Sequence, residues 1–188
     1  MMLKKLLFSA LTVLIFTSCE KYVLPQSALE YSLGVFDNTL SEYEESLNRL
    51  HNLEMLQENA LPEEKDALSS QMDSVFLQMS YLIGMHESTR VAIEKLSGKP
   101  IAEVKPAPVV VPVYRYVEAM RVFKDADASM QKEERLLQQL KTLTPEGKNI
   151  AAVKKSERKL TSFKAYYLNF AYIMQSLKPE KVATRPKD

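Results

Sequence analysis

Residues 27–59 read SALEYSLGVFDNTLSEYEESLNRLHNLEMLQEN, and the spacing of their apolar side chains decides the fold. These side chains recur every three or four positions without a miss, at Leu29, Leu33, Phe36, Leu40, Tyr43, Leu47 and Leu50. Such spacing puts them on one stripe of an α-helix and is typical of coiled-coil packing. Ser27 and Glu30 fit a capping box at its start. The stretch predicts one long helix that packs against another.

A second helix with the same apolar spacing is predicted directly after the first. Pro62, Glu63 and Glu64 suit its first turn, because a helix N-terminus accommodates proline and favours acidic side chains. Gly98 is positioned to end the helix in a left-handed conformation, and Pro100 then blocks continuation. The short break between the two helices predicts an antiparallel hairpin over residues 27–98.

Two more helices are predicted over residues 114–178. The third begins near Tyr114, and Thr144-Pro145-Glu146 fit the N-cap and first turn of the fourth. The apolar stripes of these helices include two polar residues, Glu133 and Ser156. The remaining residues, 179–188, are polar and are predicted to form a flexible tail.

The linker between the hairpins, residues 99–113, reads KPIAEVKPAPVVVPV. Its four prolines exclude a helix and favour an extended, polyproline-like chain. The run Val109–Val111 could alternatively form a short edge strand.

Charge is distributed very unevenly along the chain. Residues 19–98 carry five basic and 14 acidic side chains, a net charge of −9, whereas residues 99–188 carry 18 and 10, a net charge of +8. An acidic and a basic hairpin attract each other, so we expect an all-α protein whose two hairpins pack as a four-helix bundle or a coiled-coil-like assembly. The alternative is that the hairpins stay apart across the linker, each paired with another protein or another copy.

The N-terminus has the layout of a bacterial leader. Lys4 and Lys5 precede an apolar run over residues 6–16, which is too short to span a bilayer that needs about 20 residues. Small residues then lead to Cys19, the only cysteine of the chain.

The segment Phe16-Thr17-Ser18-Cys19 resembles a lipobox, the recognition site of lipoprotein signal peptidase, although Phe16 stands where Leu is usual. The resemblance implies that residues 1–18 are a lipoprotein signal peptide and that acyl chains, palmitate among them, are attached to Cys19. Residues 19–26 would then be a lipidated tether, with Lys21–Gln26 a flexible spacer. Under the sorting rule of such lipoproteins, Glu20 favours the outer membrane. The alternative is an ordinary secretory signal or an uncleaved anchor.

Residues with catalytic or metal-binding spacing are scarce. Neither His51 nor His86 lies three residues after a glutamate, as helical di-iron sites require, and His86 falls on an apolar stripe. The sequence contains no nucleophile elbow and no Gly-rich phosphate loop. We therefore expect no metal, no cofactor and no enzymatic activity.

The last predicted helix carries the partner-binding candidates Tyr166, Tyr172 and Ile173, which lie beside its apolar stripe. Exposed tyrosines are typical of protein interfaces, although a wide buried face would explain them equally well. The same helix carries the anion-binding candidates Lys154, Lys155, Arg158 and Lys159. The favoured interpretation of these four side chains is that they face the acidic first hairpin, with anion binding as the other.

These observations predict a lipid-anchored lipoprotein of the bacterial cell envelope, most consistent with the outer membrane and facing the periplasm. Without a reactive cluster, it would act as a helical adaptor, scaffold or assembly factor, with an envelope protein or a second copy as partner and no nucleic acid. One alternative is a protein that binds an anionic envelope component through the basic hairpin. Another is a self-assembling helical surface protein.

Overall fold

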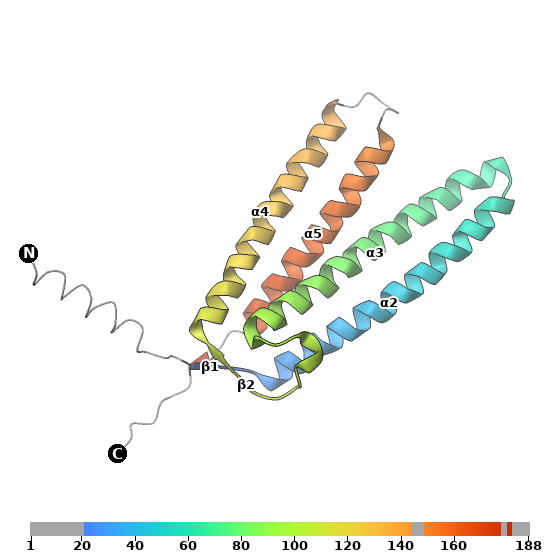
Figure 1. The fold of residues 1–188 in the computed structure, drawn as a ribbon. Coiled ribbons are helices and arrows are strands. Elements are labelled where there is room, and N and C mark those ends of the chain that lie inside the picture. Colours follow the sequence, from blue (N-terminus) through green and yellow to red (C-terminus); the bar gives the residue numbers. More distant parts are fainter. Residues whose placement is uncertain (1–20, 144–148, 178–179, 182–188) are drawn as a thin grey trace, which may run out of the picture.

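The computed structural model describes residues 21–143, 149–177 and 180–181, and it is a helical bundle, as the sequence predicts. Four long helices form two antiparallel hairpins (Figure 1): α2 (Gln26–Asn59) with α3 (Pro62–Ser97), and α4 (Val113–Leu143) with α5 (Ile150–Ser176). We call the end where the two hairpins meet the base. The opposite end, where they diverge, carries the tips.

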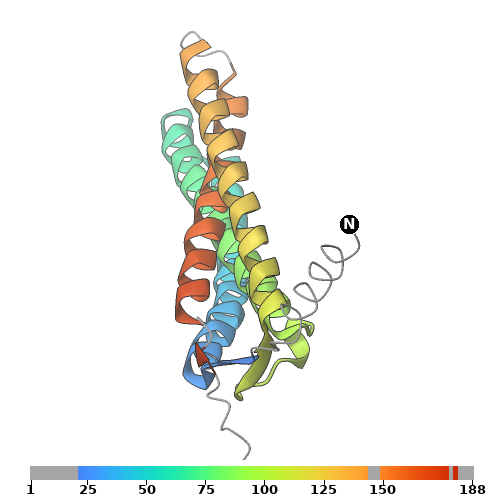
Figure 2. The ribbon, with the colours of Figure 1, turned by 90° about the vertical axis from the view of Figure 1, so that its left-hand side faces the viewer.

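The hairpins pack through α3 and α5, which share the most extensive contact between any two helices. The helices lie side by side in the order α4, α5, α3, α2, and a view turned by 90° shows the bundle edge-on (Figure 2). Contacts advance along α3 and α5 in the same direction, from Asp73 with Arg158 to Ser88 with Asn169. The two central helices are therefore parallel, each running from tip to base.

A glycine allows α3 and α5 to approach closely. A Cβ on Gly84 would overlap the backbone carbonyl oxygen of Ser162 on α5. Two turns after Ser162 on α5, Nδ2 of Asn169 lies 3.0 Å from the carbonyl oxygen of Met85 and 2.7 Å from Oγ of Ser88. These contacts fix how far α5 is shifted along α3.

The stripe that α2 turns toward α3 differs from the predicted one. Ser32, Thr39 and Ser46 are buried, whereas Leu40 and Leu47 are 50% and 43% exposed. Each buried hydroxyl donates to a carbonyl oxygen of its own helix, at 2.9, 2.9 and 2.8 Å respectively. Such hydrogen bonds satisfy the hydroxyls inside an apolar interface. The small side chains therefore take the place predicted for leucines.

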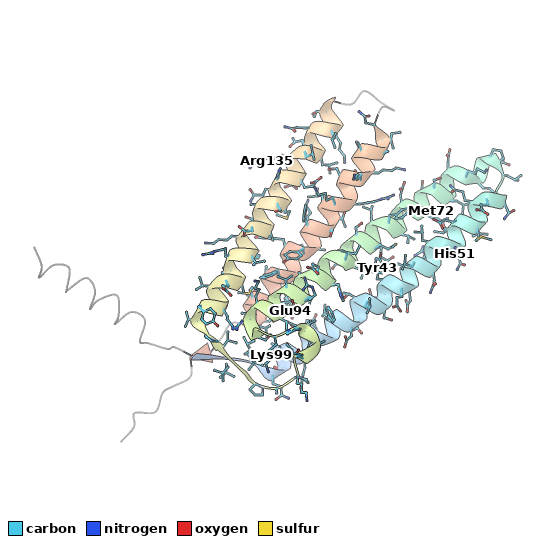
Figure 3. All side chains as sticks on the ribbon, in the orientation of Figure 1. Tyr43, His51, Met72, Glu94, Lys99 and Arg135 are labelled. Atoms are coloured by element: carbon cyan, nitrogen blue, oxygen red, sulfur yellow. The ribbon has the colours of Figure 1, made fainter. Side chains whose placement is uncertain are left out.

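The core has two parts along the bundle. Near the base, all four helices and the adjoining strands contribute to one cluster that includes Leu29, Ile93 and Phe170. Nearer the tip of the first hairpin, α2 and α3 share a smaller cluster in which Tyr43 and Met72 take part (Figure 3).

A three-stranded sheet closes the base. The strands β1 (Lys21–Leu24), β2 (Val109–Pro112) and β3 (Glu180–Lys181) lie in the order β2-β1-β3, and both pairs are antiparallel. Leu24 of β1 and Val111 of β2 are fully buried. The sheet is thus part of the core.

The sheet corrects three predictions about segments outside the helices. The predicted flexible spacer Lys21–Gln26 is mostly strand β1, and residues 180–181 of the predicted tail pair with it. The linker contains a 3-10 turn, Ile101–Glu103, and the strand that was its alternative interpretation. Burial of Leu24, Ile101 and Val111 at the base explains why the spacer and the linker are ordered.

The helix ends follow the prediction in part. Pro62, Glu63 and Glu64 form the first turn of α3, and Gly98 ends it with a φ of 72°. The capping box at Ser27 is wrong, because α2 begins at Gln26 after Pro25 and its N-cap forms no side-chain hydrogen bond. The predicted start at residues 144–146 lies outside the described residues, and α5 is described from Ile150.

Two glycine-to-alanine changes should have opposite effects. Gly84→Ala should lower the free energy of unfolding by about 1–3 kcal/mol, because its methyl group would push α3 away from α5. Gly34→Ala, in the interior of α2 with open space around the added methyl, should raise it by about 0.5–1 kcal/mol. Chemical denaturation monitored by circular dichroism measures both. Equal effects of the two changes would contradict a close contact at Gly84.

Candidate functional site

The three partner-binding candidates on α5 lie in different environments. Ile173 is 2% exposed and belongs to the basal core, so it is not available to a partner. Tyr166 is half-buried, and Tyr172 is 49% exposed. The prediction for Ile173 fails because this position of α5 faces the other helices at the base.

Tyr166 lies at the edge of the core. Its ring is 5.7 Å from that of Phe170, and it packs against the basal core. Burial raises the pKa of the Tyr166 hydroxyl to about 12, and the nearby negative charge of Glu87 contributes to the rise. The side chain therefore has a structural role, whatever else it contacts.

Tyr172 forms an exposed aromatic pair with a residue of the other hairpin. Its ring meets that of Tyr31 on α2 edge to face, with centroids 5.7 Å apart and planes inclined by 62°. Leu168, four residues before Tyr172 and so on the same face of α5, is 64% exposed. We call Tyr31, Leu168 and Tyr172 the aromatic surface. Sequence analysis missed Tyr31, because only the packing of α2 near α5 brings it to Tyr172.

Three of the four basic candidates form ion pairs within the chain, and they do so with two different carboxylates. Lys154 and Arg158 both pair with Asp73 of α3, Arg158 at 3.0 Å, so they join the two hairpins. Lys159 instead pairs at 2.7 Å with Glu133 of α4. The favoured interpretation, that these cations face the acidic hairpin, thus holds for two of the four, Lys154 and Arg158.

A cleft of about 540 Å3 lies between the hairpins toward their tips. Lys155 lines it together with Lys154 and Arg158, and Arg158 is also stacked 3.8 Å from the ring of Phe76. The cleft combines apolar and basic groups. Because Asp73 also lines it, part of its positive charge is already neutralised.

Asp73 and Glu133, the carboxyl groups paired with Lys154, Arg158 and Lys159, both have pKa values below the ordinary range. The hydrogen bond from Lys154 is the largest influence on the pKa of Asp73 and lowers it, with Arg158 adding to the effect. Burial opposes ionisation of Glu133, but hydrogen bonds from Lys159 and Ser156 outweigh it, so that the pKa of Glu133 is also lowered.

Neither histidine lies in a metal site. The ring of His86 stacks 4.0 Å from that of Phe36, and its Nδ1 lies 3.1 Å from Oγ1 of Thr39. His51 is exposed on α2 (Figure 3). Within residues 21–143, 149–177 and 180–181, no three His, Cys, Asp or Glu side chains gather in a way that could hold a metal ion.

Comparisons with known proteins leave the family open: no protein-family model, curated protein or solved structure matches this chain. No helix in the described part is both long and apolar enough to cross a membrane. Cys19, the lipidation candidate, lies outside the described residues. The functional argument therefore depends on the surfaces and the geometry of the bundle.

The ion pairs of Asp73 should make the stability depend on pH. A carboxyl whose pKa is lower in the folded than in the unfolded chain stabilises the fold above its unfolded value, about 3.9, and this contribution is lost as the pH falls through the folded value. Asp73→Asn should therefore cost about 1 kcal/mol at pH 7 and flatten the loss of stability below pH ~4. Urea unfolding between pH 2 and pH 7 tests this. Asp66→Asn, at an exposed carboxylate of the same helix, is the matched control and should leave the profile unchanged.

Proposed function

We propose that this chain is a lipid-anchored protein of the bacterial envelope that acts as a helical adaptor or scaffold for a protein complex. In this proposal, acyl chains on Cys19 hold it at the membrane. The bundle presents side-chain surfaces to a partner protein and carries out no reaction of its own.

The position of β1 is the observation that carries the proposal. β1 begins at Lys21, and it is paired on both sides at the base of the bundle. The chain from Cys19 to Lys21 can span at most about 7 Å. A lipid on Cys19 would therefore hold the base close to the membrane, and α2, at 1.5 Å per residue, would carry its tip about 50 Å away from the base.

The aromatic surface supports docking of a partner protein. Tyr31 and Tyr172 expose large side chains that are fixed by contact with each other, so little conformational entropy is lost when a partner covers them. Tyrosine is among the residues enriched at the energetic centres of protein interfaces. The aromatic surface lies near the base of the bundle, so a partner docked on it would be close to the membrane surface.

The basic cleft supports a second candidate, a protein that binds an anionic component of the envelope. The observation in its favour is that Lys154, Lys155 and Arg158 line one cleft. The adaptor is the better supported function because Lys154 and Arg158 are already paired with Asp73. Binding in the cleft would weaken steeply with ionic strength, unlike docking on the aromatic surface.

Loss of Cys19 should release the protein from the membrane. Cells fed a clickable palmitate analogue should label the intact chain, and Cys19→Ala should abolish the label and move the protein from the membrane fraction to the soluble fraction. A single acyl chain gives only marginal binding, so release should be nearly complete when all acyl chains are missing. Membrane retention of unlabelled Cys19→Ala would contradict the lipid anchor. Ser18→Ala, which keeps a small residue before the cysteine, is the control.

Tyr172→Ala and Tyr166→Ala should separate docking from stability. Tyr172→Ala removes an exposed ring that pairs with Tyr31, so it should cost about 1 kcal/mol of stability and reduce partner recovery at least tenfold. Tyr166→Ala removes a half-buried ring from the core and should cost about 2–3 kcal/mol. Thermal unfolding and co-purification after in-cell crosslinking measure the two effects. Unchanged recovery with Tyr172→Ala would argue against the aromatic surface.

A further inference from the structure

The fold leaves the most regular apolar pattern of the sequence partly uncovered. Leu33, Leu40 and Leu47 lie at seven-residue spacing, and we call them the leucine stripe. Leu33 is half-buried at the basal core, but Leu40 and Leu47 are 50% and 43% exposed. Ile83 of the neighbouring helix α3 is also 49% exposed. Exposed apolar residues that gather in this way mark an interaction site more often than scattered ones do.

A pocket lies between the leucine stripe and α3. Its volume is about 210 Å3, and its walls come from both helices of the first hairpin, from Thr39, Leu40, Tyr43, Leu82, Ile83, His86 and Glu87. Such a hole between two helices accepts a side chain from a third helix, as in coiled-coil packing. Leu40 lines the pocket, and Leu33 and Leu47 lie two turns to either side of it on the same face of α2.

A row of carboxylates runs beside the leucine stripe. Glu30, Asp37 and Glu44 also recur every seven residues, each three positions before a leucine of the stripe, and we call them the acidic row. Glu87 adds a carboxylate at the pocket, although it is paired with Arg90. In the part of the chain that the structure describes, no member of the acidic row takes part in an ion pair. Their negative charge is available to a partner.

We propose that the groove formed by α2 and α3 binds a basic amphipathic helix of a partner protein. The apolar face of that helix would pack on the leucine stripe and insert a side chain beside Leu40 and Ile83. Its lysines or arginines would lie along the acidic row. This is the helix-in-groove mode of recognition, in which apolar anchors give affinity and flanking charges set the partner and its orientation.

A second copy of this chain and an anionic lipid surface fit the groove less well. The basic helix α5 has four of its five cations in ion pairs within the chain, from Lys154, Arg158, Lys159 and Lys164. On α5 a copy therefore offers no free basic face of helical length. The other helix of the basic hairpin, α4, has five acidic side chains among its six basic ones, so its charge is nearly balanced. Anionic headgroups would be repelled by the acidic row.

Photo-crosslinking from the leucine stripe tests this inference. The full chain with benzoylphenylalanine in place of Leu47 is expressed in its native bacterium and irradiated, and the crosslinked segment is mapped by mass spectrometry. We expect an adduct with a basic amphipathic helical segment of another protein. No adduct, an adduct with lipid, an adduct with a second copy, or an adduct with an acidic or non-helical segment would each overturn the inference.

Charge-neutral variants of the groove complete the experiment. Ile83→Gln should reduce the adduct yield at least tenfold, because it places a polar amide at the pocket. Leu56→Gln, at an exposed leucine on another face of α2, should leave the yield unchanged. Equal losses from both variants would overturn the inference. The groove does not depend on the lipid anchor, so Cys19→Ala should give the same adduct. The adduct in this variant reports on the groove alone, whereas palmitate labelling of the intact chain reports on the proposed function. The two can therefore fail independently.

Discussion

The close contact between the parallel helices α3 and α5 is the constraint on which the rest of the bundle depends. A hairpin of two helices buries only one side of each, so each hairpin needs the other to cover its remaining apolar surface. Gly84 permits this by letting the backbone of α5 come near, and the amide of Asn169 sets the register through acceptors on α3. Once α3 and α5 are held in this register, their C-terminal ends meet at the base. The strands from the three non-helical segments can then assemble there.

The helices could be predicted from the sequence because their signal is local. Apolar periodicity, proline at a helix start and glycine at a helix end all act within a few residues, and α3 begins and ends where they indicate. The two polar residues on the predicted stripes of α4 and α5 also prove to be neighbours, since Oγ of Ser156 donates to Glu133 at 2.9 Å in the buried interface. The face that α2 turns inward could not be predicted. Hydropathy predicts that Leu40 rather than Thr39 is buried. It takes no account of the hydrogen bond by which the hydroxyl of Thr39 is satisfied within its own helix.

The sheet and the composition of the candidate site could be predicted only in small part, because both depend on contacts between distant segments. β1, β2 and β3 are short strands from widely separated parts of the chain, and none has a local signal strong enough to outweigh the nearby prolines. On α5, Tyr172 and Ile173 are adjacent in sequence but opposite in environment, one exposed and one in the core. The difference depends on where the neighbouring helices lie, because α5 packs mainly on α3 and α4. Tyr31 joins Tyr172 for the same reason.

Across the described part of the bundle, the opposite charges of the two hairpins contribute few ion pairs between them. Opposite net charges predict attraction between the hairpins, yet within the described residues Asp73 is the single carboxylate that joins them, through Lys154 and Arg158. The other bridges of the basic hairpin are internal to it, from Lys141, Lys159 and Lys164 to nearby glutamates. Within the described residues, folding thus pairs most of the cations of α5 and leaves the acidic face of α2 largely unpaired beside its exposed leucines. A bundle held mainly by apolar packing does not need that face for its own stability. Its charge and its apolar groups are therefore best understood as features for contacts outside the chain.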